Sequence, residues 1–276
     1  MINELSENEY NAMLSNLQDE SMEVYQAQSK QGLYLSSHKL VEFSRNPKLY
    51  QMKMDGLIGE KDSSAYKKGS AVHCLVLEGQ AEFDKRYYIG ELINPTTGKS
   101  YGSDTKKFQE RRETIGMEKD ILNKEEYQEI KNMHDAVYQH DEAFKLLDGG
   151  FGEKVLRGQI EGVDCQIRPD WVGPYGCFDL KTCDDLDWFA YDFKKWGYDL
   201  SSGFYTELIL NATGIDTDYY FVVVEKMATH RVGVFKVSFD MKRELQAQVK
   251  KQVRRLKEMK QNNKFLTGYE DVRILL

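Results

Sequence analysis

The stretch WVGPYGCF, residues 171–178, constrains the fold more strongly than any other part of the chain. Pro at the second position and Gly at the fourth position of GPYG suit a tight reversal between two antiparallel strands. One register follows, in which Gly173 lies opposite Gly176 and Asp170 lies opposite Asp179. Like charges placed directly opposite each other destabilise a sheet. The sequence therefore demands a nearby positive charge, or one carboxylate that stays protonated.

A lysine stands where that charge is needed. Lys181 follows Asp179 by two residues, and because side chains alternate along a strand, both lie on one face. The same register places Arg168 opposite Lys181. The spacing alone is equally compatible with a simple surface ion pair between Asp179 and Lys181.

A second turn adds a third carboxylate. The segment IEGV, residues 160–163, predicts a two-residue hairpin whose register places Glu153 opposite Asp170. Pro169 lacks an N–H and can introduce a bulge into this pairing. Three carboxylates in one row are what a hard divalent cation requires, and Mg²⁺ keeps several waters that phosphate oxygens can replace.

The remaining segments predict the architecture around these turns. A helix is expected to begin at Ser36 or Ser37, whose hydroxyls can cap free N–H groups, and Pro47 favours a break or a new helix. From residue 153 the chain shows three short strand-like segments, a helical stretch interrupted at Gly197, two more strands and a closing helix. This order predicts an α/β fold with a mixed central sheet flanked by helices and a helical N-terminal extension. We expect one domain over residues 1–276, with an acidic arm or short helix at 1–30, a core at 33–240 and a basic helix and tail at 241–276.

Charge and composition limit the partners. The net charge is −7, which disfavours DNA binding by the surface as a whole, but residues 242–264 hold nine basic and two acidic side chains. This basic stretch could track DNA, dock a partner or simply be solvated. The sequence has no apolar run of membrane-spanning length, an acidic N-terminus unlike a signal peptide, and four cysteines without a CxxC pair. We therefore expect no membrane association and a reducing, cytoplasmic location.

Four segments together resemble a known family. IRPDWVG followed by FDLKT resembles the PD-(D/E)xK nuclease motif. GSAVHCLVLEG resembles the G-x-A-x-H-x-L-x-L-E segment of exodeoxyribonuclease VIII (RecE-like) and related phage recombination exonucleases. LSSHKLVEFSRNPKLY resembles the Ser-rich first helix of that family, and YDLSSGFYTELI resembles its helix after the motif. The resemblance covers residues 33–240 and implies a restriction-endonuclease-like fold.

The resemblance also implies roles for individual residues. Lys181 matches the catalytic lysine, with Asp170 and Asp179 as the catalytic acids. The implied metal ligands are His73, Asp170, Asp179 and the backbone carbonyl of Leu180, to which the strand register adds Glu153. Without the family, His73 would be read as a buried structural histidine. Glu78 matches the Glu of the L-E pair, although a structural role at a helix end fits it better.

Contacts to DNA are expected beyond the metal site. The free N–H groups of a helix N-terminus bind phosphate, so Ser36, Ser37 and Arg45 are candidates for a terminal 5′-phosphate pocket, with helix capping and a surface arginine as the alternative. Relatives carry a Gln in the helix after the motif, where this chain has Ser201, and this departure puts fine positioning of substrate or water in doubt. The full set of DNA-binding candidates is Ser36, Ser37, Arg45, Arg168, Ser201 and Tyr205.

By resemblance, the chain is expected to be a Mg²⁺-dependent exodeoxyribonuclease, with Mn²⁺ able to substitute. It would resect the 5′-ended strand of double-stranded DNA ends and leave a 3′ overhang for a RecT-like single-strand annealing protein, in a phage or prophage recombination system. Relatives form rings, so a homo-oligomer is expected. Two alternatives stay open: a nuclease resembling the RecB domain or the iron–sulfur nucleases of CRISPR systems, and a non-catalytic subunit that binds DNA ends.

Overall fold

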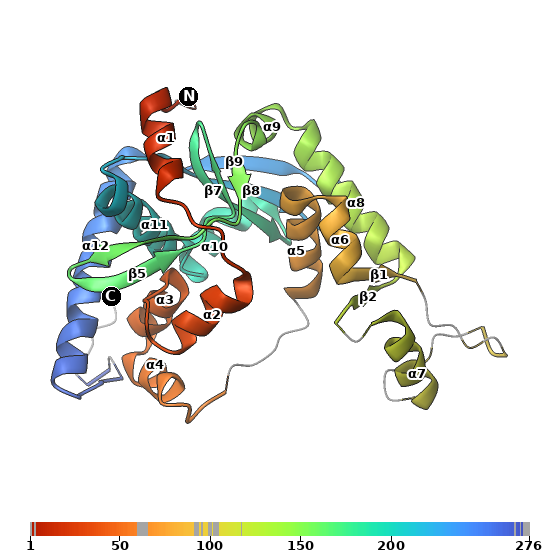
Figure 1. Ribbon diagram of the computed structural model, residues 1–276, viewed down its shortest axis with the longest axis horizontal. Helices are drawn as coiled ribbons and strands as arrows, with labels where there is room; N and C mark the ends of the chain where they lie inside the picture. The colour runs from red at the N-terminus through yellow and green to blue at the C-terminus, as the bar shows by residue number, and fades with distance from the viewer. Residues whose placement is uncertain are drawn as a thin grey trace.

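A five-stranded mixed sheet lies at the centre of the molecule (Figure 1). The computed structural model describes residues 2, 4–59, 66–90, 94, 96–98, 101, 105–116, 118–267, 269–270 and 272. Strands β7 and β8 pair in parallel, and the other neighbours in the sheet are antiparallel. The predicted α/β fold with a mixed sheet is therefore confirmed. In spatial order the strands are β3 (Phe151–Gly152), β6 (Trp171–Gly173), β7 (Gly176–Cys183), β8 (Tyr219–Glu225) and β9 (Val232–Lys236).

Both faces of the sheet are covered by helices, which explains why β8 is buried along its whole length. On one face the apolar core includes residues of α3 (Ser37–Arg45), α11 (Tyr198–Thr213) and α12 (Phe239–Gln261). On the other it includes residues of α5 (Tyr66–His73), the π-helical turn η1 (Cys74–Glu78), α8 (Lys124–Gln139) and α9 (Asp141–Leu147). Figure 1 shows the two groups on opposite sides of the sheet. Among the described helices, none is both long and apolar enough to span a bilayer.

Local sequence signals set the helix boundaries where they were expected. Ser36 is the N-cap of α3, and its hydroxyl accepts a hydrogen bond from the Lys39 N–H. Pro47 is the first residue of α4 (Pro47–Met54), where its missing N–H costs nothing. Gly197, with φ of +77°, separates α10 (Phe189–Lys195) from α11, and the short 3₁₀ turn η2 (Leu186–Trp188) precedes α10.

The N-terminal region is not a loose arm. It forms α1 (Glu7–Ser15), which Ser6 and Glu9 close with a capping box, and α2 (Met22–Lys30). Both flank a separate hairpin of β4 (Leu156–Ile160) and β5 (Val163–Ile167). Single bridges join Gln18 to Val155 and Leu35 to Cys165, so this part of the chain extends the hairpin on both sides.

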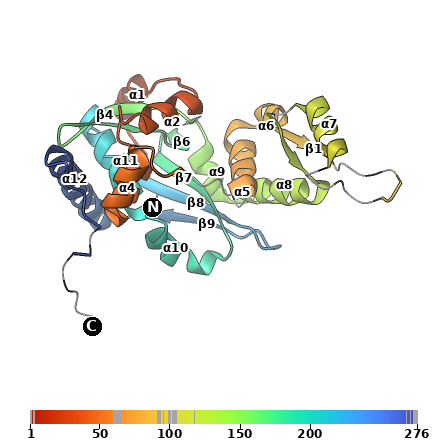
Figure 2. The same cartoon turned by 90° about the horizontal axis from the view of Figure 1, so that it is seen from below.

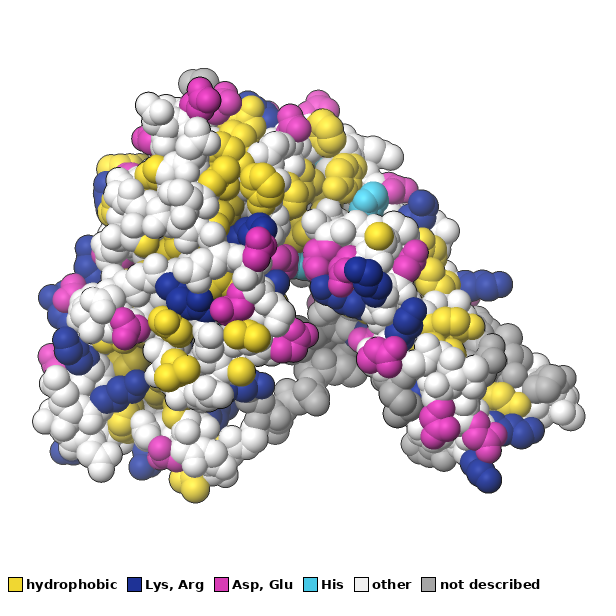
Figure 3. Space-filling view, in the orientation of Figure 1, with side chains coloured by type: hydrophobic (Ala, Val, Ile, Leu, Met, Phe, Trp, Pro, Cys, Tyr) yellow, Lys and Arg dark blue, Asp and Glu magenta, His cyan; other side chains and the backbone are white. Residues whose placement is uncertain are grey.

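A smaller lobe projects away from the sheet (Figure 2). It contains α6 (Gln80–Arg86), β1 (Tyr87–Ile89), α7 (Lys106–Ile115) and β2 (Asp120–Leu122), and β1 pairs with β2 in parallel. The space-filling view shows a broad notch between this lobe and the main body (Figure 3). Helix α5 contacts β7 and helix α8 contacts β8, so these two helices join the lobe to the central sheet.

The basic C-terminal helix packs into the fold through one apolar face. The predicted stripe of α12 is buried, and it consists of Leu245, Val249, Val253 and Leu256. Several of its basic side chains are paired within the protein. Asp216 accepts from Lys242 at 2.7 Å and from Arg243 at 2.9 Å, and Lys250 lies 3.3 Å from Glu207. Much of the positive charge of residues 242–264 therefore neutralises acids of the same chain.

The contact between α11 and α12 depends on the absence of a side chain at Gly203. A Cβ there would lie 2.7 Å from Leu245 Cβ and 2.9 Å from its carbonyl carbon. We predict that Gly203→Val lowers the stability by about 1–3 kcal/mol, since overpacking forces the two helices apart. Thermal unfolding would show this as a lower melting temperature. Ala247→Val, at an exposed position of α12, is the control, and equal effects of the two substitutions would contradict the packing argument.

Candidate active site

The hairpin register that brings the acids together is the one read from the sequence. Gly173 pairs with Gly176, and the ladder continues to Trp171 opposite Phe178. One further step of this register places Asp170 opposite Asp179. The ladder ends at Trp171, however, and the segment with Pro169 leaves the sheet. The predicted pairing of Arg168 with Lys181 was therefore wrong, because a strand cannot continue through a proline in the interior of a sheet.

The upstream register is also confirmed. Ile160 pairs with Val163 in the β4–β5 hairpin, and Gly152 pairs with Trp171 in the sheet. The two pairings follow the same residue-to-residue register, although the residues between the two paired segments form no ladder. Glu153 consequently lies beside Asp170, and its N–H donates to the Asp170 carbonyl at 3.3 Å. Its φ of +62° is unusual for a residue with a side chain and marks a locally constrained backbone.

A histidine from the other side of the sheet completes a group of ligands. His73, the last residue of α5, places Nε2 3.0 Å from Oδ1 of Asp170 and Nδ1 3.4 Å from Oε1 of Glu153. One ligand atom from each of these three residues lies within 4.8 Å of the others. The residue types and the distances fit a divalent cation that takes oxygen and imidazole ligands.

Lys181 lies between the two aspartates. Its Nζ is 3.2 Å from Oδ2 of Asp179 and 3.5 Å from Oδ2 of Asp170. The same Asp170 oxygen accepts a hydrogen bond of 2.8 Å from the N–H of Leu180. One ammonium therefore bridges the two carboxylates that the hairpin forces together, and Asp170 belongs to both the ligand group and the lysine pair.

The two aspartates differ in their electrostatic surroundings. Burial alone would raise the pKa of Asp170, but Lys181, His73 and the Leu180 N–H outweigh it and hold that pKa well below the usual range. Burial, helped by the charge of Asp170, raises the pKa of Asp179 despite the opposing effect of Lys181. For Lys181, the two carboxylates outweigh burial and raise the pKa, so it stays charged at neutral pH.

The backbone of β7 supports a further ligand. In a strand, the N–H and C=O of one residue point toward the same neighbour. Because the Leu180 N–H points to Asp170, its carbonyl faces the same edge, beyond the point where β6 stops pairing. This direction favours the expected metal role of the Leu180 carbonyl, which stays a prediction.

Several DNA-binding candidates meet on the α3 and α11 side of this cluster. The Tyr205 hydroxyl donates to the Arg168 carbonyl at 3.3 Å and hydrogen-bonds with Ser37. The Ser36 hydroxyl lies 3.0 Å from that of Ser29. Ser201 occupies the turn of α11 before Tyr205, and the N–H of Ser201 bonds the Gly197 carbonyl within the helix. The hydroxyls of Ser36 and Ser37 are thus already held inside the protein.

Two of the DNA-binding candidates, Arg45 and Arg168, are held by other parts of the protein. Arg45 lies at the opposite end of α3 from Ser36 and Ser37, about 12 Å away along the axis, and it donates to the Lys195 carbonyl at 2.5 Å. The three therefore do not converge on one phosphate. Arg168 is nearly buried and forms an ion pair with Glu153.

Glu78 binds Arg86 through both oxygens, at 2.8 and 2.5 Å, which supports the structural role expected for it.

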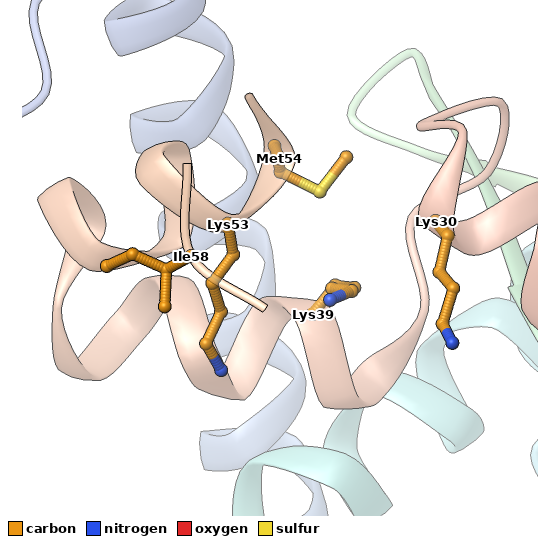
Figure 4. A pocket seen from close by; sticks show the side chains of 5 residues that line it. All are labelled: Lys30, Lys39, Lys53, Met54 and Ile58. Carbon is orange, nitrogen blue, oxygen red and sulfur yellow. The ribbon is translucent and has the colours of Figure 1, made fainter. Parts of the chain in front are cut away.

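Sequence reasoning missed two features near the site. Burial raises the pKa of Tyr25 in α2, and the charges of Arg168 and Asp179 act on that pKa in opposite directions. Lysines from three helices line one pocket beside the N-terminal end of α3, together with Met54 and Ile58 (Figure 4). The three are Lys30, Lys39 and Lys53, and Glu42 accepts from two of them. No spacing rule links these residues, because they meet only when α2, α3 and α4 pack together.

The ligand group predicts a response to divalent cations. Mg²⁺ or Mn²⁺ should raise the melting temperature of the protein, since an ion bound only by the folded state stabilises it by about 2.7 kcal/mol at 100 times its dissociation constant. In Asp170→Asn this rise should largely disappear, because one ligand and its charge are lost. Asp164→Asn, which alters an exposed aspartate of the neighbouring hairpin, should keep the full rise in differential scanning fluorimetry. Equal shifts in both variants would show that the ion binds elsewhere.

Comparisons with known proteins agree with this geometry. A family model described as "PDDEXK-like domain of unknown function (DUF3799)" matches residues 36–269. The crystal structure of a candidate exonuclease from Eubacterium rectale superposes with a TM-score of 0.64 at 17% sequence identity, covering 94% of this chain and 96% of that one. No curated protein matches the sequence. The structural likeness shows a shared fold, and the family match extends over the helices, the sheet and the acidic cluster. The chain belongs to this family of PDDEXK-like domains.

Proposed function

We propose that the chain is a divalent-metal-dependent nuclease that degrades double-stranded DNA from an end. The observation that carries this proposal is that Asp170 belongs both to a group of metal-ligand residues and to an ion pair with Lys181. On one side His73 and Glu153 offer metal ligands, and on the other Lys181 bridges to Asp179. A cation bound by such residues polarises the scissile phosphate and lowers the pKa of a bound water.

Each residue has a separate task in this proposal. His73, Glu153 and Asp170 hold Mg²⁺ or Mn²⁺, with Asp179 and the Leu180 carbonyl as further ligands. Lys181 acts as a fixed positive charge because the neighbouring carboxylates raise its pKa. Such a charge stabilises the negative charge that develops on a phosphate during hydrolysis. Arg168 holds Glu153 in place through their ion pair.

The substrate is inferred from charge and from the family resemblance. The pocket lined by Lys30, Lys39 and Lys53 gathers three ammonium groups from three helices, and such a group of positive charges suits a DNA phosphate. The resemblance to exodeoxyribonuclease VIII supports resection of the 5′-ended strand, a 3′ overhang and a homo-oligomeric ring. A single-strand annealing protein in a phage or prophage recombination system is the partner that this product would serve.

The residues present favour this function over an iron–sulfur nuclease and over a non-catalytic subunit. An iron–sulfur nuclease needs four converging cysteines, whereas Cys74 lies in the core on one face of the sheet and Cys177 in the core on the other. Burial raises the pKa of these thiols, to about 11 for Cys74 and about 12 for Cys177, so they remain protonated. A non-catalytic subunit has no need for three carboxylates, a histidine and a lysine in one cluster.

Digestion of end-labelled linear duplex DNA in Mg²⁺ tests the proposal. Wild type should release the 5′ label progressively and leave closed circular DNA intact. Lys181→Ala should slow the reaction by a factor on the order of 10²–10³, the loss typical for one preorganised charge at a reacting phosphate or carbonyl. Lys226→Ala, which removes a lysine just beyond the end of β8, should digest at the wild-type rate.

Three outcomes would count against parts of this function. Cleavage of closed circles would show that no DNA end is required. Equal rates in Lys181→Ala and wild type would remove the catalytic role of the lysine. Earlier release of a 3′ label would reverse the proposed polarity while leaving the nuclease assignment intact.

A further inference from the structure

Helix α10 and the residues that cap its two ends, Trp188 and Trp196, expose large aromatic side chains. Trp188, Tyr191 and Trp196 are 65%, 59% and 51% exposed, and two of the three tryptophans in the chain are among them. The opposite face of the helix is well packed, because Phe189 is 3% exposed and its ring lies 4.8 Å from that of Phe235. The exposed rings are therefore not a sign of poor packing.

A lysine lies between two of these rings. The Nζ of Lys195 is 5.5 Å from the ring centroid of Tyr191 and 4.9 Å from that of Trp196, both within the range of cation–π attraction. Trp188, the last residue of η2 and the N-cap of α10, precedes Tyr191 by three residues. We call Trp188, Tyr191, Lys195 and Trp196 the α10 platform.

The charges around the platform favour an anionic partner. Three of the four acids in residues 184–192 are paired within the protein: Asp184 lies 3.0 Å from Lys226, and Asp185 and Asp187 lie 3.2 and 3.3 Å from Arg231. The fourth acid is Asp192 in α10. Lys194 is exposed next to Lys195 on the same helix. Arg45 adds a third positive charge, since its guanidinium binds the Lys195 carbonyl at 2.5 Å.

The platform is rigidly connected to the acidic cluster. Gly197 ends α10 so close to α3 that an added Cβ would lie 2.6 Å from Val41. The next residue, Tyr198, begins α11, and its ring centroid lies 5.5 Å from the Nζ of Lys181. The ring of Phe189 in α10 packs 6.3 Å from that of Tyr198. The packed rings of Phe189 and Tyr198 thus lie between the exposed rings and Lys181.

We propose that the α10 platform binds unpaired nucleotides of single-stranded DNA, stacking bases on Trp188, Tyr191 and Trp196 while Lys195 contacts the backbone. Every base offers a π face, so aromatic stacking holds single strands without regard to sequence. A double helix hides those faces between its base pairs, which leaves unpaired nucleotides as the occupant that uses all three rings. The inference rests on the proposed function, because degradation of one strand leaves its complement single-stranded. The platform would retain that remaining strand.

The binding test is carried out in EDTA, so that it does not depend on catalysis. Anisotropy of a labelled dT oligomer measures affinity for wild type and for Trp188→Ala/Trp196→Ala. Stacking is worth a factor of roughly 5 to 150 per base, so the double variant should bind at least about ten-fold more weakly. Trp188→Phe/Trp196→Phe should restore most of the affinity, because phenyl rings also stack. Phe144→Ala, which removes an exposed ring of α9, should bind as wild type does.

Intrinsic fluorescence gives an independent readout. In Trp171→Phe the two platform tryptophans are the only ones left, and their emission should be quenched by an unlabelled dT oligomer but much less by a duplex of equal length. Unchanged dT affinity in the double alanine variant would overturn the proposal and assign the platform to another partner, such as a protein. Failure of the nuclease assay with intact dT binding would instead reject the proposed function alone.

Discussion

The site depends on two carboxylates that the backbone forces together. The reversal at residues 173–176 pairs Trp171 with Phe178, and it brings together Asp170 and Asp179, the next residues of the same register, just beyond the end of the ladder. Two unit charges 4 Å apart repel by about 4 kcal/mol at an effective dielectric constant of 20. Lys181 offsets this repulsion by bridging both acids at 3.2 and 3.5 Å. Glu153 adds a third negative charge, and Lys181 and Arg168 together do not neutralise all three carboxylates. A bound cation would supply the missing positive charge, and the metal is therefore central to the proposed chemistry.

The cluster forms where the sheet is interrupted. The segment with Pro169 joins β5 of the separate hairpin to β6 of the central sheet, and Asp170 lies in this segment, where α5 reaches it from one side and α11 from the other. His73 enters from α5, while Tyr205 and Tyr198 enter from α11. A continuous pair of strands would have buried these positions within the sheet. The irregular segment therefore lets His73, Lys181 and Tyr205 reach residues 168–170 from different elements.

Positive charge is distributed in a way that the overall charge of −7 conceals. In α12, the most basic stretch of the sequence, several side chains form ion pairs with acids of the same molecule, such as Asp216 and Glu207. The lysine pocket and the α10 platform draw their charges from separate helices instead. Both lie beside elements that contact the acidic cluster, since Ser37 of α3 reaches Tyr205 and Tyr198 follows α10. Local arrangement, more than total charge, decides where an anionic polymer can bind.

The sequence by itself determined the features that depend on neighbouring residues: the turn at GPYG, the hairpin at Glu161 and Gly162, the shared face of Asp179 and Lys181, and the caps at Ser36 and Pro47. Turn geometry and the two-residue period of a strand act over a few residues, so the register of Glu153 with Asp170 could be predicted. Only the tertiary structure decided that Arg168 forms an ion pair with Glu153 and that Arg45 donates to the Lys195 carbonyl, at the opposite end of α3 from Ser37. These contacts join segments up to about 150 residues apart in sequence, as between Arg45 and the Lys195 carbonyl, and the packing of helices on the sheet sets them, for which no local spacing rule exists.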